Sequence, residues 1–158
     1  MIEGMDVDAV IRYLIEEFDH VVAVQHEGDT FFTYDPSGRP PDGAWQPFAT
    51  VVTGDRHDRV SNLDRDGAYR LNIGLTKTTY TGRFGAPPRQ RDADWVLDTG
   101  FDYAAEDQLM PHPHYASQYW VCVVNPGDAT FEEIKPLLVE AYAIAVRKVD
   151  RRAARRTG

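Results

Sequence analysis

In Tyr69-Arg-Leu-Asn-Ile-Gly-Leu75, large apolar side chains alternate with polar or small ones. Successive side chains of a β-strand point to opposite faces, so the two sets lie on different sides of the strand. The alternation predicts an antiparallel strand whose apolar face, with Leu71 and Ile73, packs on a core. We expect the other face, with Arg70 and Asn72, to be open to solvent or to a ligand, so that Asn72 is exposed.

Further strands are predicted on both sides of this one. Residues 21–25 and 30–34 are short runs separated by His26-Glu-Gly-Asp29, which is typical of a β-hairpin. Residues 48–53 predict a third strand. Residues 119–124, Tyr-Trp-Val-Cys-Val-Val, are apolar on both faces and therefore predict a central strand.

Helical periodicity marks both ends of the chain. Apolar residues recur at helical spacing over residues 7–18 and again over residues 131–149. Thr130 and Glu133 fit a capping box at the start of the second helix. Pro136 lies too deep for that start, so either the first turn kinks there or the regular helix begins at Pro136.

The order of these elements predicts the fold class. A short helical segment is expected over residues 76–84. We predict an α+β fold, a two-layer sandwich in which an antiparallel sheet of about five strands is flanked on one face by the N- and C-terminal helices. Residues 1–150 are expected to form a single domain, followed by a basic tail over residues 151–158.

The charge of the chain is unevenly distributed. The net charge is −8, yet residues 147–158 carry +5, so the other 146 residues carry −13. So acidic a body repels phosphate backbones and disfavours nucleic acid as a partner. Cys122 is the only cysteine, and no signal peptide or membrane span is legible, so we expect a cytoplasmic location without membrane attachment.

Two histidines alternate with prolines in Met110-Pro-His-Pro-His114, directly before the most apolar strand. Prolines stiffen the backbone, so we expect His112 to be held in a rigid rim that lines a concave pocket beside the 98–107 segment. The pair could form a metal site with Asp102 or Asp107. Two histidines alone fall short of the ligand number that structural zinc needs, so no metal is predicted. A histidine bonded to the backbone is the alternative.

Two other polar groups are candidates for chemistry. Arg70 and Asn72 place a guanidinium beside an amide, which suits a carboxylate- or amide-bearing ligand, although a solvated face or a dimer interface is as good an explanation. In Asp55-Arg-His-Asp58, a carboxylate can orient His57 as a general base if the fold brings them together. An ordinary exposed turn accounts for the same residues.

The terminal third resembles the small bacterial MmcQ/YjbR-like domains, through Tyr119-Trp-Val121 in a strand and Ala141-Tyr142 in the closing helix. This resemblance implies a frataxin-like fold, and such domains are often labelled DNA-binding. Longer relatives of unknown function are similar in Thr53-Gly-Asp-Arg-His57, in Asp98-Thr-Gly-Phe-Asp-Tyr103 and in Met110-Pro-His-Pro113. Their function is not something that the resemblance supplies.

We expect a binding or interaction domain without a cofactor, acting as a monomer or a homodimer on a small anionic or polar ligand. The first alternative is a small-molecule enzyme that uses His112 or His57 as general acid or base, oriented by Asp98 or Asp107. DNA binding comes third, because the body is acidic. Trp95 and Tyr115 are expected to form apolar walls of the site. The expected ligand contacts are Arg70, Asn72, Asp98, Asp107, His112, His114 and Trp120.

Overall fold

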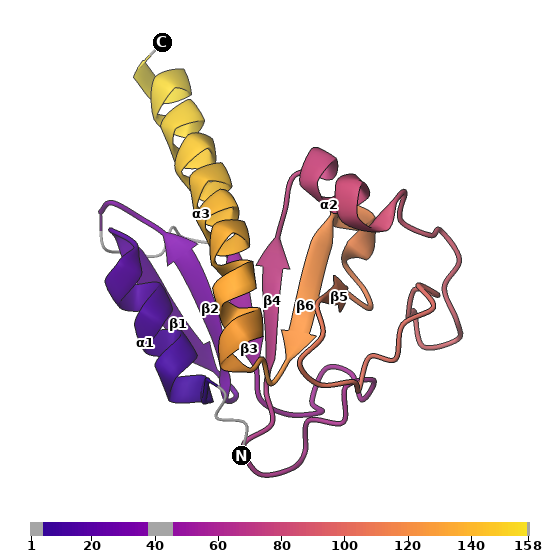
Figure 1. Cartoon of the computed structure of the whole chain (residues 1–158). Helices are drawn as coiled ribbons and strands as arrows, with labels where there is room; N and C mark the ends of the chain where they lie inside the picture. Colours follow the sequence, from indigo (N-terminus) through magenta and orange to yellow (C-terminus); the bar gives the residue numbers. More distant parts are fainter. Residues whose placement is uncertain (1–4, 38–45, 158) are drawn as a thin grey trace.

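The computed structural model describes residues 5–37 and 46–157. These residues form an antiparallel sheet of six strands in the order β1-β2-β3-β4-β6-β5. The N-terminal and C-terminal helices pack on one face of this sheet (Figure 1). The predicted α+β class is therefore confirmed. The strands are β1 (Val21–His26), β2 (Asp29–Tyr34), β3 (Ala49–Val52), β4 (Arg70–Gly74), β5 (Met110–Pro111) and β6 (Trp120–Val124). The helices are α1 (Val7–Glu17), α2 (Lys77–Phe84), the short 3-10 helix η1 (Ala116–Gln118) and α3 (Asp128–Thr157).

The hairpin of β1 and β2 closes through a two-residue turn. Glu27 and Gly28 both have positive φ angles, 52° and 86°, as the tightest hairpin turns require. The register pairs His26 with Asp29, so Asp29 begins β2 directly after the turn. This placement buries the Asp29 side chain at one end of the sheet.

The helix face of the sheet carries the larger core. Leu71 and Ile73 are fully buried there, as the alternation in β4 predicts. Their neighbours on β6 are Val123 and Val121, which the β4–β6 register places opposite them. The helices contribute the rest of this core, chiefly Val10, Leu14, Phe131, Ile134, Leu138 and Ala141.

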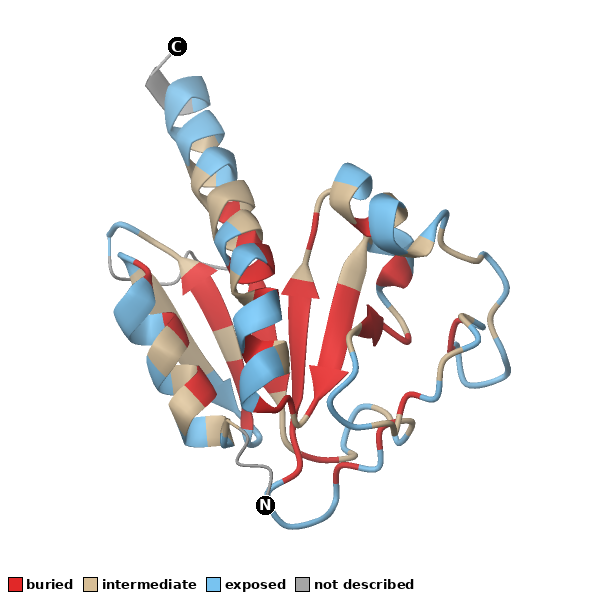
Figure 2. Ribbon diagram, viewed as in Figure 1, coloured by how far each residue is buried: buried red, intermediate tan, exposed pale blue. Residues whose placement is uncertain are grey.

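The opposite face of the sheet is not open, and the expectation of an exposed Asn72 is wrong. Asn72 is 3% exposed and Arg70 is 2% exposed. Irregular segments between β3 and β4 and between α2 and β6 cover this face with packed side chains, and Figure 2 shows β4 and β6 largely buried. Their side chains form a second, smaller core with Cys122 and Val124 of β6; the covering residues include Leu63, Ala68, Val96 and Tyr103.

Helix α3 differs from its predicted bounds at both ends. It begins at Asp128 rather than near Thr130, so the predicted capping box does not start it. Asp107 supplies the polar partner instead, since its carboxylate accepts the backbone N–H of Gly127 at 2.6 Å. The helix continues through Pro136 to Thr157, and its last turns project beyond the sheet (Figure 1).

None of the helices within residues 5–37 and 46–157 is long and apolar enough to cross a membrane.

Candidate functional site

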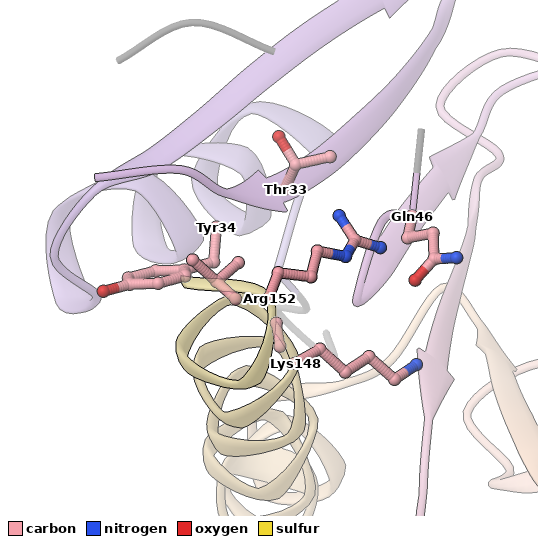
Figure 3. A pocket seen from close by; sticks show the side chains of 7 residues that line it. Thr33, Tyr34, Gln46, Lys148 and Arg152 are labelled. Atoms are coloured by element: carbon pink, nitrogen blue, oxygen red, sulfur yellow. The ribbon is translucent and has the colours of Figure 1, made fainter. Parts of the chain in front are cut away.

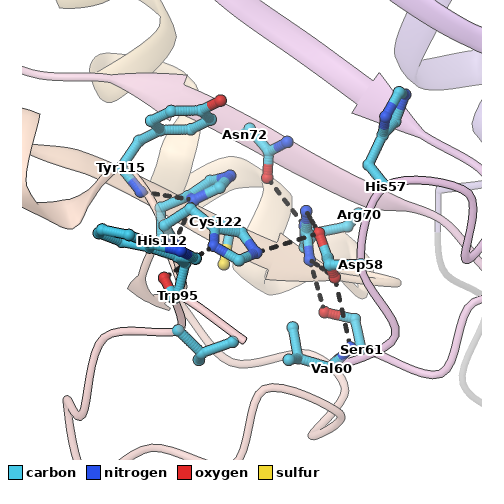
Figure 4. Close-up of polar contacts among 12 residues, drawn as sticks. His57, Asp58, Val60, Ser61, Arg70, Asn72, Trp95, His112, Tyr115 and Cys122 are labelled. Carbon is cyan, nitrogen blue, oxygen red and sulfur yellow. Dashed lines mark hydrogen bonds and ion pairs between the residues drawn. The ribbon is translucent and has the colours of Figure 1, made fainter. Parts of the chain in front are cut away.

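Arg70 lies at the centre of a buried polar network on the covered face of the sheet. Its guanidinium forms two hydrogen bonds with the Asp58 carboxylate, at 3.1 and 3.0 Å. A further donor reaches Ser61 Oγ at 2.9 Å, and Nε donates to Asn72 Oδ1 at 3.1 Å. Figure 4 shows these side chains gathered around the guanidinium. Charge-assisted, bidentate pairing of this kind fixes the direction of both partners.

Asn72 completes the network towards β3. Its amide donates to Thr50 Oγ1 at 2.9 Å, while its oxygen accepts from Arg70. Strand pairing produces this arrangement, because the register places Asn72 directly opposite Thr50. Arg70 and Asn72 therefore do lie together, as predicted, but their hydrogen bonds are to neighbouring protein groups.

Asp58 reaches this network from the irregular segment between β3 and β4. Burial alone would raise the pKa of its carboxyl group, but the hydrogen bonds and charge of Arg70, with a smaller contribution from His114, hold that pKa below its ordinary value. Asp58 is therefore an anion beneath the surface, partnered by the Arg70 cation.

His112 is buried and serves the backbone of its own turn. The side chain is 2% exposed, and its Nδ1 accepts the backbone N–H groups of His114 and Tyr115, both at 3.0 Å. Because Nδ1 accepts twice, the neutral ring carries its hydrogen on Nε2. Burial, and then the nearby charges of Arg70 and His114, lower the pKa of His112 well below its ordinary value. The ring is thus held neutral and its Nδ1 lone pair is occupied.

His114 is half-buried and bridges the network to the surface. Its Nε2 lies 3.7 Å from Asp58 Oδ2, and its Nδ1 lies 3.1 Å from the carbonyl oxygen of Trp95. Arg91 ties the same segments together, because its guanidinium donates to the carbonyl oxygens of Trp95, at 2.8 Å, and His114, at 3.0 Å. Both ring nitrogens of His114 therefore face protein acceptors.

Two large aromatic side chains remain exposed beside His114. Trp95 is 71% exposed and Tyr115 is 53% exposed. The Tyr115 ring centroid lies 6.4 Å from that of His114 and 4.9 Å from that of His112. Trp95 has a φ of 64°, a left-handed conformation that is uncommon for a bulky residue, in a turn whose N–H groups bond to Asp92. We call Trp95, His114 and Tyr115 the aromatic surface.

A second polar cluster joins His57 to the start of β2. The Asp29 carboxylate is 1% exposed, and its Oδ1 accepts the Thr53 N–H at 2.9 Å and an Arg56 N–H at 3.1 Å. His57 is exposed, and its Nε2 lies 3.2 Å from Asp29 Oδ2. That oxygen lacks a hydrogen bond of good geometry, so the distance shows proximity without alignment. The partner of His57 is thus Asp29, not the adjacent Asp55 or Asp58.

The remaining predicted residues lie outside both clusters. Asp98 is exposed. Asp107 caps α3, and hydrogen bonds from Thr130 and Gly127 lower its pKa. Trp120 covers Gly74, where an added Cβ atom would meet the indole ring at 2.8 Å. Burial raises the pKa of Cys122 to about 12, which leaves a core thiol with little nucleophilic character.

No grouping of three or more His, Cys, Asp or Glu side chains suited to a metal ion occurs within the described part of the chain. Nδ1 of His112 and both ring nitrogens of His114 already face protein groups, as described above. The rings left exposed among these site residues are those of Trp95 and Tyr115 in the aromatic surface and the His57 imidazole.

Asp29, Ser61 and Thr50 are site residues that the sequence did not single out. Asp29 lies 27 residues from Arg56 in the sequence, and Thr50 lies 22 residues from Asn72. Only the position of Asp29 at the end of a predicted hairpin turn could have drawn attention to it. Thr50 becomes visible once the sheet register is known, and Ser61 only once the path of the segment between β3 and β4 is known.

The sequence matches a family model over residues 5–154, described as a family of unknown function, DUF6194. Neither the curated proteins nor the solved structures gave a match. The family match lends no support to the resemblance to MmcQ/YjbR-like domains. Because the match covers nearly the whole chain, the protein belongs to DUF6194, a family whose function is unknown.

Proposed function

We propose that the protein is a binding domain for a small polar ligand that has a flat ring, recognised at the aromatic surface. One observation carries this proposal: Trp95 and Tyr115 are 71% and 53% exposed, and both adjoin His114, whose Nδ1 lies 3.1 Å from the Trp95 carbonyl oxygen. Trp95 also holds a strained left-handed φ of 64°. Strain in an exposed aromatic residue persists only where the surroundings enforce it, which is common at ligand sites.

The buried network supports this surface and does not itself meet the ligand. Arg70 and Asn72 hydrogen-bond to other protein groups and are nearly inaccessible to solvent. Their effect reaches the surface through Asp58, which lies 3.7 Å from His114 Nε2. A site whose exposed groups are held by a rigid second layer binds with less loss of side-chain freedom. The ligand contacts therefore lie one layer further out than the sheet residues.

The ring and charge of the ligand follow from the chemistry of the surface. Tryptophan and tyrosine rings stack on flat heteroaromatic rings and on the apolar faces of sugars, with about 1–3 kcal/mol from each stacked base in nucleic-acid complexes. The net charge of −8 disfavours polyanions at long range. An uncharged nucleoside or glycoside is the ligand class that fits both conditions.

Saturation-transfer NMR with adenosine and methyl glucoside as probes tests the proposal. Wild-type protein should transfer saturation to at least one probe, and W95A and Y115A should lose that transfer. I15A is the matched control, because Ile15 is also a large exposed apolar side chain but lies on α1. Each exposed-site variant should unfold within about 0.5 kcal/mol of wild type. Absence of transfer to both probes, or equal transfer by W95A, would contradict the proposal.

A second candidate function is proton transfer by His57. The observation that favours it is the buried Asp29 carboxylate, whose Oδ2 lies 3.2 Å from Nε2 of the exposed His57 imidazole, within the reach that a carboxylate–histidine pair requires. The test compares the rates at which H57Q and H26Q hydrolyse p-nitrophenyl acetate. His26 is the control because it is also exposed, and its ion pair within the described residues is with the exposed Glu27, at 3.9 Å. If His57 and Asp29 act together as a catalytic pair, the rate should fall about a hundredfold or more in H57Q and not in H26Q. Equal, small effects of the two variants would remove this candidate.

A further inference from the structure

A small hollow lies between the C-terminal half of α3 and the strand β2, remote from the aromatic surface in the sequence (Figure 3). Its volume is about 40 Å³, and its walls include Thr33 and Tyr34 of β2, Gln46, and Lys148 and Arg152 of α3. A water molecule needs about 10–15 Å³ of such space, so the hollow can hold a group of a few heavy atoms but no larger ligand.

Two cationic side chains border this hollow from consecutive turns of one helix. Lys148 and Arg152 are four residues apart, so they project from the same side of α3, and Figure 3 shows both beside Gln46. No ion pair or hydrogen bond is recorded for either cation with any described residue. By contrast, the guanidinium groups of Arg56, Arg65 and Arg70 each pair with a carboxylate.

The absence of a counterion among the described residues stands out because the protein is acidic. Asp and Glu number 25 against 17 Lys and Arg, so carboxylates are plentiful. Two like charges one turn apart repel each other, and an anion between them would remove that repulsion. Lysine supplies a point charge, arginine a planar fork of donors, and the Gln46 amide a neutral donor, which together suit the oxygens of an oxyanion.

We propose that this hollow binds a small oxyanion, the phosphate or carboxylate group of a ligand or the free ion. Lys148 and Arg152 would neutralise it, and the Gln46 amide would add a directional hydrogen bond. The hollow is too small to enclose more than the anionic group itself, so any remainder of the ligand would extend into solvent. The inference does not depend on the aromatic surface, and either can fail without the other.

Titration of ¹⁵N-labelled protein with inorganic phosphate, methyl phosphate and acetate, at one fixed ionic strength, tests the proposal. The side-chain amide signals of Gln46 should shift and saturate with at least one of these probes. R152A should weaken that affinity by about tenfold or more, as expected for the loss of a charge-assisted bond. Tighter binding of methyl phosphate than of phosphate would identify an esterified phosphate as the source, and preference for acetate would identify a carboxylate.

R151A is the matched control, because it removes the same charge from the neighbouring, exposed position of α3. It should leave the affinity within twofold of wild type, whereas K148A should weaken it as R152A does. Equal loss in R151A and R152A would show diffuse attraction to the basic helix end and would overturn the proposal. Absence of saturable Gln46 shifts up to about 10 millimolar probe, which corresponds to a binding free energy weaker than roughly −3 kcal/mol, would overturn it as well.

Discussion

Replacing His112 should separate a structural histidine from a catalytic one. Nδ1 of His112 accepts the N–H groups two and three residues later, the same pattern that an asparagine side chain makes in a tight turn. His112→Asn should therefore preserve the turn, whereas His112→Ala should leave both N–H groups without their acceptor. The structure thus predicts that the alanine variant is less stable. A histidine exposed on a rim would instead lose ligand binding or activity with little change in stability.

The size of that loss follows from the two hydrogen bonds and the burial. Leaving a buried donor unsatisfied costs about 1–3 kcal/mol, and both N–H groups here are part-buried, so the lower end applies to each. The cavity left by the ring adds to this cost. We expect His112→Ala to lower the free energy of unfolding by about 2–4 kcal/mol, and His112→Asn to recover at least half of that. Urea-induced unfolding at pH 7.5, followed by far-UV circular dichroism, measures both values.

The same residue makes stability depend on pH with a definite sign. The folded-state pKa of His112 is lowered, so below about pH 6.5 the unfolded chain binds a proton that the folded chain does not. Stability is therefore lost as the pH falls below about 6.5. Wild type should therefore lose more stability than His112→Asn between pH 7.5 and pH 5.5, by up to about 1.4 kcal/mol. Parallel pH profiles, or an alanine variant within about 0.5 kcal/mol of wild type, would refute the structural reading of His112.

Four further outcomes are expected. Leu71→Ala should cost about 2–5 kcal/mol in chemical unfolding, because its side chain is fully buried in the larger core; a smaller loss would show that the site collapses. Gly74→Ala should cost about 1–3 kcal/mol and alter the near-UV spectrum, because the new Cβ would meet Trp120 at 2.8 Å; an unchanged spectrum would contradict that contact. Arg70→Ala should lower the free energy of unfolding by about 3–5 kcal/mol, because it leaves the Asp58 carboxylate without its cation. Adding Asp58→Asn should restore part of that loss, since the side chain at position 58 is then neutral; additive losses would argue against coupling. Mobility-shift assays at physiological salt should give duplex DNA an affinity weaker than about 10⁻⁴–10⁻⁶ M, and micromolar binding lost on deleting residues 147–158 would show that the basic end outweighs the acidic body.

Local patterns predicted the sheet and its helix face well. The strict alternation from Tyr69 to Leu75 correctly placed Leu71 and Ile73 in the core, since a buried face selects apolar residues at every second position. The apolar run of β6 correctly predicted a strand buried on both faces. The second covering layer could not be predicted, because irregular segments carry no periodicity. Asn72 was therefore expected in solvent but lies beneath that layer.

The candidate site was predicted only where its residues are neighbours in sequence or in register. Arg70 and Asn72 are two positions apart on one strand, so their contact follows from the period of the strand. The pairing of Asp29 with His57 depends on how the β1–β2 turn meets the segment after β3, and no local rule specifies that. His112 was expected in a rigid rim lining a pocket, whereas the residue is 2% exposed. Its acceptor role needs the positions of two backbone N–H groups, which only coordinates give.

The position of Cys122 makes its thiol a natural probe of local opening in this protein. It is the only cysteine, and it lies fully buried under the irregular segments that cover the sheet. With a pKa raised to about 12, its thiol offers almost no thiolate to a maleimide or a disulfide reagent while that cover is closed. The labelling rate of the unmodified protein therefore measures how often the cover lifts, independently of the helix face and without any engineered probe.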